Sequence, residues 1–88
     1  MYFVYVLISE KQGRHYVGLT NDIYRRLEEH NKGKTKSTRF YSPWRILFKE
    51  NYKTRIEARN REKYLKSGVG REFIKNGPVA QLDRAAAF

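Results

Sequence analysis

Hydrophobic positions gather in three short stretches of the chain, and each stretch predicts a strand. Residues 2–8 (YFVYVLI) are apolar on both alternating faces, which indicates a buried and central strand. Residues 15–19 and 45–52 have similar strand character. The polar segment 9–14 contains Gly13 and is long enough to join the first two strands as a hairpin. We therefore expect a three-stranded, largely antiparallel sheet.

Helical spacing begins after the second strand, over residues 21–32. Ile23, Arg26, Leu27 and His30 fall at positions i, i+3, i+4 and i+7, so they share one face of the helix. That face must cover the sheet, and Arg26 and His30 are carried inward with it. One interpretation is that both reach past the edge of the stripe to water. The other is that they have a partner or a function, because buried charge is costly without one.

A second helix is predicted from the capping box at residues 54–57 to about Ser67. Ala58, Glu62 and Leu65 share one face of this helix, so Glu62 is turned inward between two apolar side chains. A short final helix is predicted at residues 70–75. The expected caps are Thr20 or Asn21 and Gly33 for the first helix, and Thr54 and Gly68 for the second.

These elements predict an α+β fold: a three-stranded, largely antiparallel sheet flanked by helices. Its expected extent is residues 1–75, because residues 76–88 (NGPVAQLDRAAAF) have no clear period and suggest a disordered tail. The chain of 88 residues has no cysteine, so neither a disulfide nor a thiolate metal site is available. The core must come from 40% hydrophobic residues, with an aromatic share of 15%.

The formal net charge of +10, from 19 basic and 9 acidic residues, predicts an anionic partner, and nucleic acid is the commonest. The loop at residues 32–42 adds Lys34, Lys36 and Arg39 to this charge. No apolar run approaches the roughly 20 residues of a membrane span. The first residues also lack the features of a signal peptide. We therefore expect a cytoplasmic protein that does not bind membranes.

Several short motifs occur in a characteristic order. Tyr16-Val17-Gly18 is followed by Arg26 ten positions after its tyrosine and by His30 four positions later. Phe3-Val4-Tyr5 precedes it, and the second helix carries Glu62-Lys63-Tyr64-Leu65-Lys66. This set resembles the GIY-YIG nuclease family in its compact stand-alone form. It is similar to the catalytic domains of GIY-YIG homing endonucleases and of the nucleotide-excision repair nuclease subunit.

The resemblance extends over nearly the whole chain, from about residue 2 to about residue 75, with two departures. Phe3 stands where the family has the glycine of its first triplet, and Val17 replaces the isoleucine of the second. Both tyrosines of the signature, Tyr5 and Tyr16, are kept. A hairpin would bring them onto neighbouring strands, although their shared face depends on a register that the sequence does not fix.

The resemblance implies a catalytic set, namely Tyr5, Tyr16, Arg26, His30 and Glu62. Glu62 would hold a divalent cation, Mg²⁺ or Mn²⁺. Arg26 would stabilise the charge that develops on the phosphate. One tyrosine would activate water; Tyr16 is our first choice for this base, while His30 could instead be the base or relay the proton. The expected nucleic-acid contacts are Gly18, where a phosphate can approach the backbone closely, and Lys34, Lys36, Arg39 and Lys66.

Each candidate also has an ordinary structural explanation. Tyr5 and Tyr16 could be core aromatics. Glu62 could form a surface ion pair with Arg55 or Lys66. Gly18 could simply relieve crowding.

The sequence therefore predicts a metal-dependent endonuclease that cuts DNA, such as the branched or damaged DNA met in repair, with structural or weak specificity. A small domain offers little surface for reading bases. The alternative is a non-catalytic nucleic-acid-binding module on the same scaffold. Phe3, in place of the first signature glycine, leaves this alternative open. A protein partner that supplies specificity is a third possibility.

Overall fold

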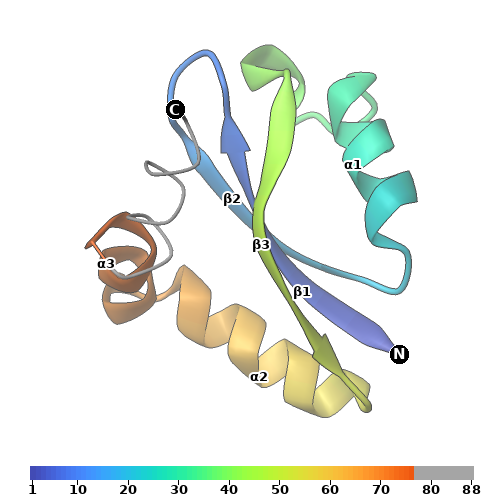
Figure 1. The fold of residues 1–88 in the computed structure, drawn as a ribbon, viewed down its shortest axis with the longest axis vertical. Helices are drawn as coiled ribbons and strands as arrows, with labels where there is room; N and C mark the ends of the chain where they lie inside the picture. Colours follow the sequence, from blue (N-terminus) through green and yellow to red (C-terminus); the bar gives the residue numbers. More distant parts are fainter. Residues whose placement is uncertain (77–88) are drawn as a thin grey trace.

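The computed structural model describes residues 1–76, and its elements follow one another along the chain as a hairpin, a helix, a third strand and two further helices (Figure 1). The elements are β1 (Tyr2–Ser9), β2 (His15–Thr20), α1 (Ile23–Asn31), a short 3₁₀ helix (Arg39–Tyr41), β3 (Trp44–Tyr52), α2 (Arg55–Lys66) and α3 (Gly68–Asn76). The predicted tail lies outside the described residues, apart from Asn76 at the end of α3.

The three strands form one antiparallel sheet in the order β2-β1-β3, which confirms the predicted fold class and the central position of β1. The β1–β2 hairpin turns at Gly13, whose φ of 66° suits a residue without a side chain. In the register of this hairpin, Tyr5 pairs with Gly18 and Leu7 pairs with Tyr16. Paired residues share a face, so Tyr5 and Tyr16 both lie on the same side of the sheet.

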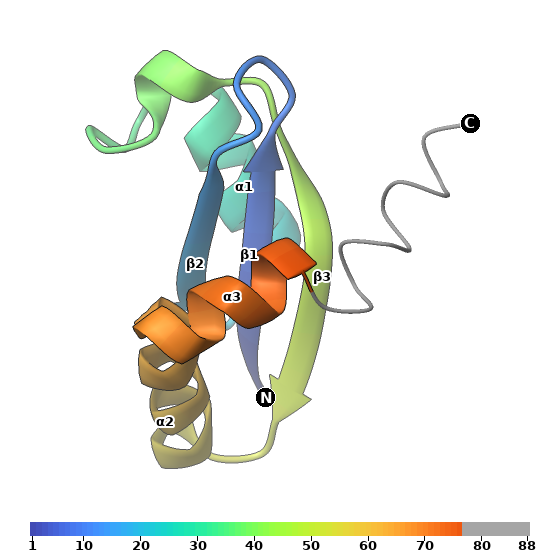
Figure 2. The same cartoon turned by 90° about the vertical axis from the view of Figure 1, so that its left-hand side faces the viewer.

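Helices cover both faces of the sheet, with α1 on one side and α2 and α3 on the other (Figures 1 and 2). Alternate residues of β1 enter the two layers, as expected for a central strand that is buried on both faces. On the α1 side the buried core consists of Tyr5, Leu7, Ile23 and Trp44. On the other side it consists of Val4, Val6, Ala58, Leu65 and Ile74.

The start of α1 differs from the prediction, because its N-cap is Asp22 and not Thr20 or Asn21. Thr20 still belongs to β2, and its hydroxyl accepts a hydrogen bond from the Asp22 N–H at 3.1 Å. The Asp22 carboxylate then accepts from the Arg25 N–H at 3.1 Å. At the other end of the helix Gly33 has a φ of 76°, which confirms its left-handed conformation.

The boundary between α2 and α3 also corrects the sequence reading. Thr54 caps α2 as predicted, accepting from the Glu57 N–H at 3.2 Å. The helix ends at Lys66, however, and Gly68 is already the first residue of α3. Ser67 separates the two helices in an extended conformation, and its hydroxyl accepts from the Gly70 N–H at 3.2 Å. A serine that caps a new helix, rather than a glycine that ends the old one, therefore turns the chain here.

No helix within residues 1–76 combines the length and the apolar character that crossing a membrane requires.

Candidate active site

The centre of the candidate site is Tyr5, on the α1 side of the sheet. Its side chain is buried, and its ring crosses β2 at Gly18, the residue with which it pairs. A Cβ atom at residue 18 would lie 2.3 Å from the Tyr5 hydroxyl oxygen and 2.4 Å from its Cζ. Glycine at this position therefore makes room for the tyrosine, which gives Gly18 a packing role in the structure. A phosphate contact at Gly18 stays a prediction.

A series of hydrogen bonds links Tyr5, through His30 of α1, to the loop at residues 32–42, which we call the basic loop. The Tyr5 hydroxyl lies 3.1 Å from His30 Nε2, and His30 Nδ1 lies 2.8 Å from Thr38 Oγ1. The Thr38 hydroxyl can donate to the Thr35 carbonyl oxygen, 3.4 Å away. Thr38 then accepts from the Nδ1–H group of His30, which leaves Nε2 to accept from the Tyr5 O–H. With the protons placed in this way, Tyr5, His30 and Thr38 each have a hydrogen-bond partner for their donor group.

Burial sets the protonation of both ring side chains. Together with the smaller effect of the positive charge of Arg26, it lowers the pKa of His30 to about 4. Burial also raises the pKa of Tyr5 to about 12, although Arg26 next to the phenol opposes that rise. Near pH 7 His30 is therefore neutral and Tyr5 keeps its proton. Tyr5 is suited to donate a hydrogen bond and poorly suited to remove a proton.

Arg26 and Tyr16 complete the cluster on the α1 side. Arg26 is held by an ion pair with Glu29 (Nη1 to Oε1, 2.9 Å), which raises its pKa, so the guanidinium is always charged. The Tyr16 ring packs edge-on against His30, with ring centroids 4.7 Å apart, and it lies 6.3 Å from the ring of Tyr5. The structure thus brings Tyr5, Tyr16, Arg26 and His30 together.

Glu62 comes from α2, on the other side of the sheet. Its side chain is only 7% exposed, and both carboxylate oxygens are occupied, by Arg59 Nη1 at 2.8 Å and Lys66 Nζ at 3.1 Å. Arg59, rather than Arg55, is therefore the second partner beside Lys66. The negative charge of Glu62 makes the smallest contribution to the raised pKa of Tyr5, after burial and the influence of Arg26 and Tyr16.

Comparison with known proteins identifies this arrangement. A family model described as the GIY-YIG catalytic domain matches residues 1–75. The chain belongs to the GIY-YIG family. The UPF0213 protein YazA from Bacillus subtilis is 38% identical over 66 residues, which span 74% of this chain and 66% of YazA. A UPF0213 protein from Staphylococcus aureus (strain Mu3 / ATCC 700698) is 34% identical over 67 residues, spanning 75% of this chain and 80% of the relative.

The fold has a solved counterpart in the same group of relatives. The solution NMR structure of the UPF0213 protein BH0048 from Bacillus halodurans has 31% sequence identity and a TM-score of 0.52, and the match covers 96% of each chain. The GIY-YIG family is a nuclease superfamily, and its members typically use divalent metals.

The residues present fit a hydrated magnesium ion that is shared with a substrate. Within residues 1–76 no group of three or more His, Cys, Asp or Glu side chains could enclose a metal ion. Mg²⁺ does not require such a cage, because it keeps several waters and often uses one or two carboxylates together with substrate phosphates. Glu62 supplies one nearly buried carboxylate, from α2 on the other side of the sheet. To bind a cation, it must release Arg59 or Lys66.

Two clefts open along β2, the edge strand beside the candidate site. The first, which we call the three-arginine cleft, has a volume of about 350 Å³ and is lined chiefly by Leu19, Thr20, Arg25, Arg26, Glu29 and Arg55. The second, the Lys66 cleft, has a volume of about 320 Å³ and is lined chiefly by Tyr16, Val17, Leu65, Lys66, Arg71 and Ile74. Both clefts are bounded by residues of β2.

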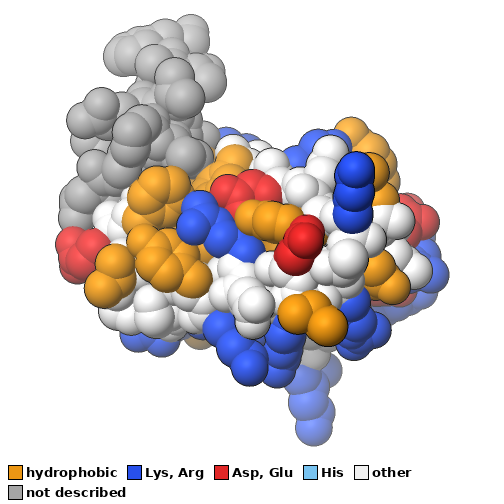
Figure 3. Space-filling view, turned by 90° about the horizontal axis from the view of Figure 1, so that it is seen from below, with side chains coloured by type: hydrophobic (Ala, Val, Ile, Leu, Met, Phe, Trp, Pro, Cys, Tyr) orange, Lys and Arg blue, Asp and Glu red, His pale blue; other side chains and the backbone are white. Residues whose placement is uncertain are grey.

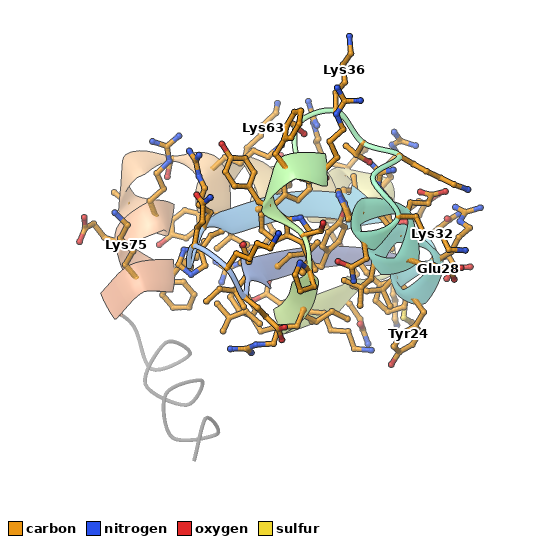
Figure 4. The ribbon with its side chains drawn as sticks, turned by 90° about the horizontal axis from the view of Figure 1, so that it is seen from above. Tyr24, Glu28, Lys32, Lys36, Lys63 and Lys75 are labelled. Atoms are coloured by element: carbon orange, nitrogen blue, oxygen red, sulfur yellow. The ribbon has the colours of Figure 1, made fainter. Side chains whose placement is uncertain are left out.

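The predicted nucleic-acid contacts outside β2 are all exposed side chains: Lys34, Lys36, Arg39 and Lys66. Seen from below, Lys and Arg side chains gather along the lower border of the molecule, the side on which β2 forms the sheet edge (Figure 3). Seen from above, Lys36 of the loop and Lys63 of α2 both lie on the β2 side of the sheet (Figure 4). Positive charge is therefore present on this side of the protein.

Sequence reasoning missed Thr38 and Glu29, which orient His30 and Arg26. Thr38 is 1% exposed, and its carbonyl oxygen accepts from the indole N–H of Trp44 at 2.9 Å, which ties the basic loop to the core. Nothing in the local sequence distinguishes Thr38 from its polar neighbours, because its partners are eight and six residues away. Glu29 could have been found, since it lies three residues after Arg26 on one helix.

Proposed function

We propose that this chain is a divalent-metal-dependent endonuclease that hydrolyses phosphodiester bonds in DNA, acts in the cytoplasm, and selects substrates by structure or only weakly by sequence. The observation that supports it most is the buried Tyr5–His30 hydrogen bond of 3.1 Å next to the Arg26 guanidinium. An oriented phenol and a guanidinium at one site suit a phosphate whose charge grows during attack.

In this proposal Tyr16 is the group that accepts the proton of the attacking water. Tyr5 donates its hydrogen bond to His30, and burial holds its proton in place, so its role is to position water or phosphate. Tyr16 lies at the half-buried edge of the sheet and lines the Lys66 cleft, where substrate can reach it. Arg26 is free to bind two phosphate oxygens from its remaining donors.

A cation held by Glu62 would supply charge neutralisation at the phosphate and the leaving oxygen. Lys66 now binds the Glu62 carboxylate. If a cation took its place, Lys66 would be available to the DNA backbone. Arg59 can move in the same way, because its side chain is 57% exposed.

A second candidate function is supported by the same ion pairs. Arg59 and Lys66 pair with both oxygens of Glu62, so this carboxylate needs no metal cation to balance its charge. Such an arrangement is expected of a non-catalytic nucleic-acid-binding module. Phe3 in place of the first signature glycine points the same way. Both candidates use the basic β2 side, and they differ in whether DNA is cut.

The deciding experiment is a cleavage assay on plain, flapped and branched DNA with Mg²⁺, with Mn²⁺ and with chelator. We expect the wild type to cut only with metal, and Glu62→Gln to abolish cutting while DNA binding is nearly unchanged. Glu57→Gln, an exposed carboxylate in the first turn of the same helix, is the matched control and should cut normally. Absence of cutting with every metal would favour the binding module.

A further inference from the structure

The two clefts beside β2 have donors that the proposed chemistry does not use. In the three-arginine cleft, Arg26 is paired with Glu29, whereas Arg25 and Arg55 add two more guanidinium groups from α1 and α2. Among residues 1–76 no carboxylate is recorded at ion-pair distance from either of them. The contact of Arg25 is a marginal hydrogen bond of 3.5 Å to Asn21 Oδ1. This cleft therefore has unmatched positive charge.

The Lys66 cleft lies at the other end of β2 and has a different lining. Leu65 and Ile74 form its apolar part, and Lys66 and Arg71 bring the cationic groups. Both cationic residues are exposed. Tyr16, our candidate base, lines the same cleft. An anion in this cleft would therefore lie beside the strand that carries the group proposed to activate water.

The spacing of the clefts indicates one extended ligand rather than two separate ones. Tyr16 and Val17 line one cleft and Leu19 lines the other, so the β2 residues of the two clefts lie two to three positions apart along the strand, roughly 7–10 Å. A single phosphate cannot occupy both. Gly18 lies between them on β2, and the Glu62 helix extends from the Arg55 end to the Lys66 end.

We propose that the two clefts hold phosphates on either side of the phosphate that is cut, so that one nucleic-acid strand runs along β2 from the Lys66 cleft to the three-arginine cleft. This inference rests on the proposed function and adds its substrate path. A guanidinium fork binds phosphate oxygens in pairs, so Arg25 and Arg55 form one subsite. Arg71 and the released Lys66 form the other. Arg26 faces both the Tyr5 hydroxyl and the three-arginine cleft, and it connects this subsite to the chemistry.

The distribution of charge favours a polyanion that is longer than the clefts themselves. The exposed Lys36 of the basic loop and Lys63 of α2 continue the positive surface on the β2 side (Figure 4). Lys49 is a natural comparison, because it is exposed on β3 at the opposite edge of the sheet, against the rings of Phe3 and Tyr24.

The first test measures binding without cutting. Labelled single-stranded and flapped DNA is titrated with wild type, Arg25→Gln, Arg55→Gln, Arg71→Gln and the control Lys49→Gln in chelator, over a range of salt. The slope of log K against log salt is negative, and each cleft variant should make it shallower by about 0.7–0.9, the value for one lost phosphate contact. Lys49→Gln should leave the slope unchanged. The proposal would be overturned if the three cleft variants had the same slope as the Lys49→Gln control. It would also be overturned if polyglutamate displaced all of the bound DNA.

The second test locates the strand. The phosphate on each side of the mapped cut is replaced, one at a time, by an uncharged methylphosphonate. Either replacement should slow cutting by the wild type, Arg55→Gln should lose its response to one of them, and Arg71→Gln to the other. Unaltered responses in both variants would overturn the strand path although the nuclease stands. If the wild type cuts nothing, the proposed function is lost, and the salt slopes still decide whether the clefts bind DNA.

Discussion

Tyr5 and Gly18 fit together so closely that a methyl group at residue 18 would come within 2.3 Å of the Tyr5 hydroxyl oxygen. The glycine of the second signature triplet is thus tied to the tyrosine of the first. The pairing of β1 with β2 sets this contact, and it places the Tyr5 hydroxyl at His30.

Gly18→Ala should therefore displace the Tyr5 ring. We expect a loss of about 1–3 kcal/mol in the free energy of unfolding, as for overpacked cores, together with slower DNA cutting. Urea denaturation and the cleavage assay measure the two effects. Gly68→Ala is the control, because no atom lies within 4 Å of the added Cβ, and its stability should be equal or slightly higher. Equal stability of both variants would contradict the contact.

The buried His30 should make stability depend on pH. Its pKa is about 4 in the folded protein against 6.5 for the unfolded side chain, so the unfolded state binds the proton first as pH falls. The stabilisation is complete above pH 6.5 and is lost between pH 6.5 and 4. From pH 7 to pH 5 the loss is about 2 kcal/mol, at 1.36 kcal/mol per pH unit.

NMR titration of the imidazole measures this pKa directly. Denaturation curves at pH 7 and pH 5 should show the loss in the wild type and in His15→Gln, and a smaller loss in His30→Gln. An imidazole of His30 that titrates near 6.5 in the folded protein would show that the ring is solvated.

Thr38 should act as a positioning residue for His30. Thr38→Val removes the acceptor of the Nδ1–H group and leaves a buried donor unpaired, at a cost of about 1–3 kcal/mol in stability. The imidazole can then change tautomer, which ¹⁵N shifts of the ring report, and kcat should fall more than KM changes. Thr38→Ser keeps the hydroxyl and should restore both the tautomer and kcat. If serine and valine behave alike, packing rather than the hydrogen bond explains the effect.

Arg26→Ala should raise the barrier to cutting by about 2–4 kcal/mol, by analogy with the loss of one oxyanion donor. Arg26→Lys keeps the charge but loses the paired donors, so we expect it to recover only part of the rate. Single-turnover cleavage separates this effect from binding. Full activity of the alanine variant would remove Arg26 from the catalytic set.

The sequence predicted most of the fold because its signals are local. Alternation within residues 2–8 and helical spacing around Ala58, Glu62 and Leu65 each lie within one element. The turn at Ser67 was missed, since serine and glycine next to each other suit either a helix end or a new helix start.

The candidate site was predicted less completely, because its contacts cross between elements. The inward side of α1 could be found from its period, but the register that sets Tyr5 on Gly18 could not. The partners of Glu62 depend on which of several neighbouring cations can reach a nearly buried carboxylate. Only the packed structure shows that Arg59, and not Arg55, pairs with Glu62.

The position of β2 at the edge of the sheet also affects how copies of the protein meet. An edge strand offers backbone groups to which another strand can add, and like charges nearby oppose this. Two copies that approached through β2 would bring their most basic sides together, from chains of +10 each. Their repulsion would oppose pairing through this edge and leave it open for an anion. The lysines and arginines that we propose to contact nucleic acid would thus also oppose self-association through β2.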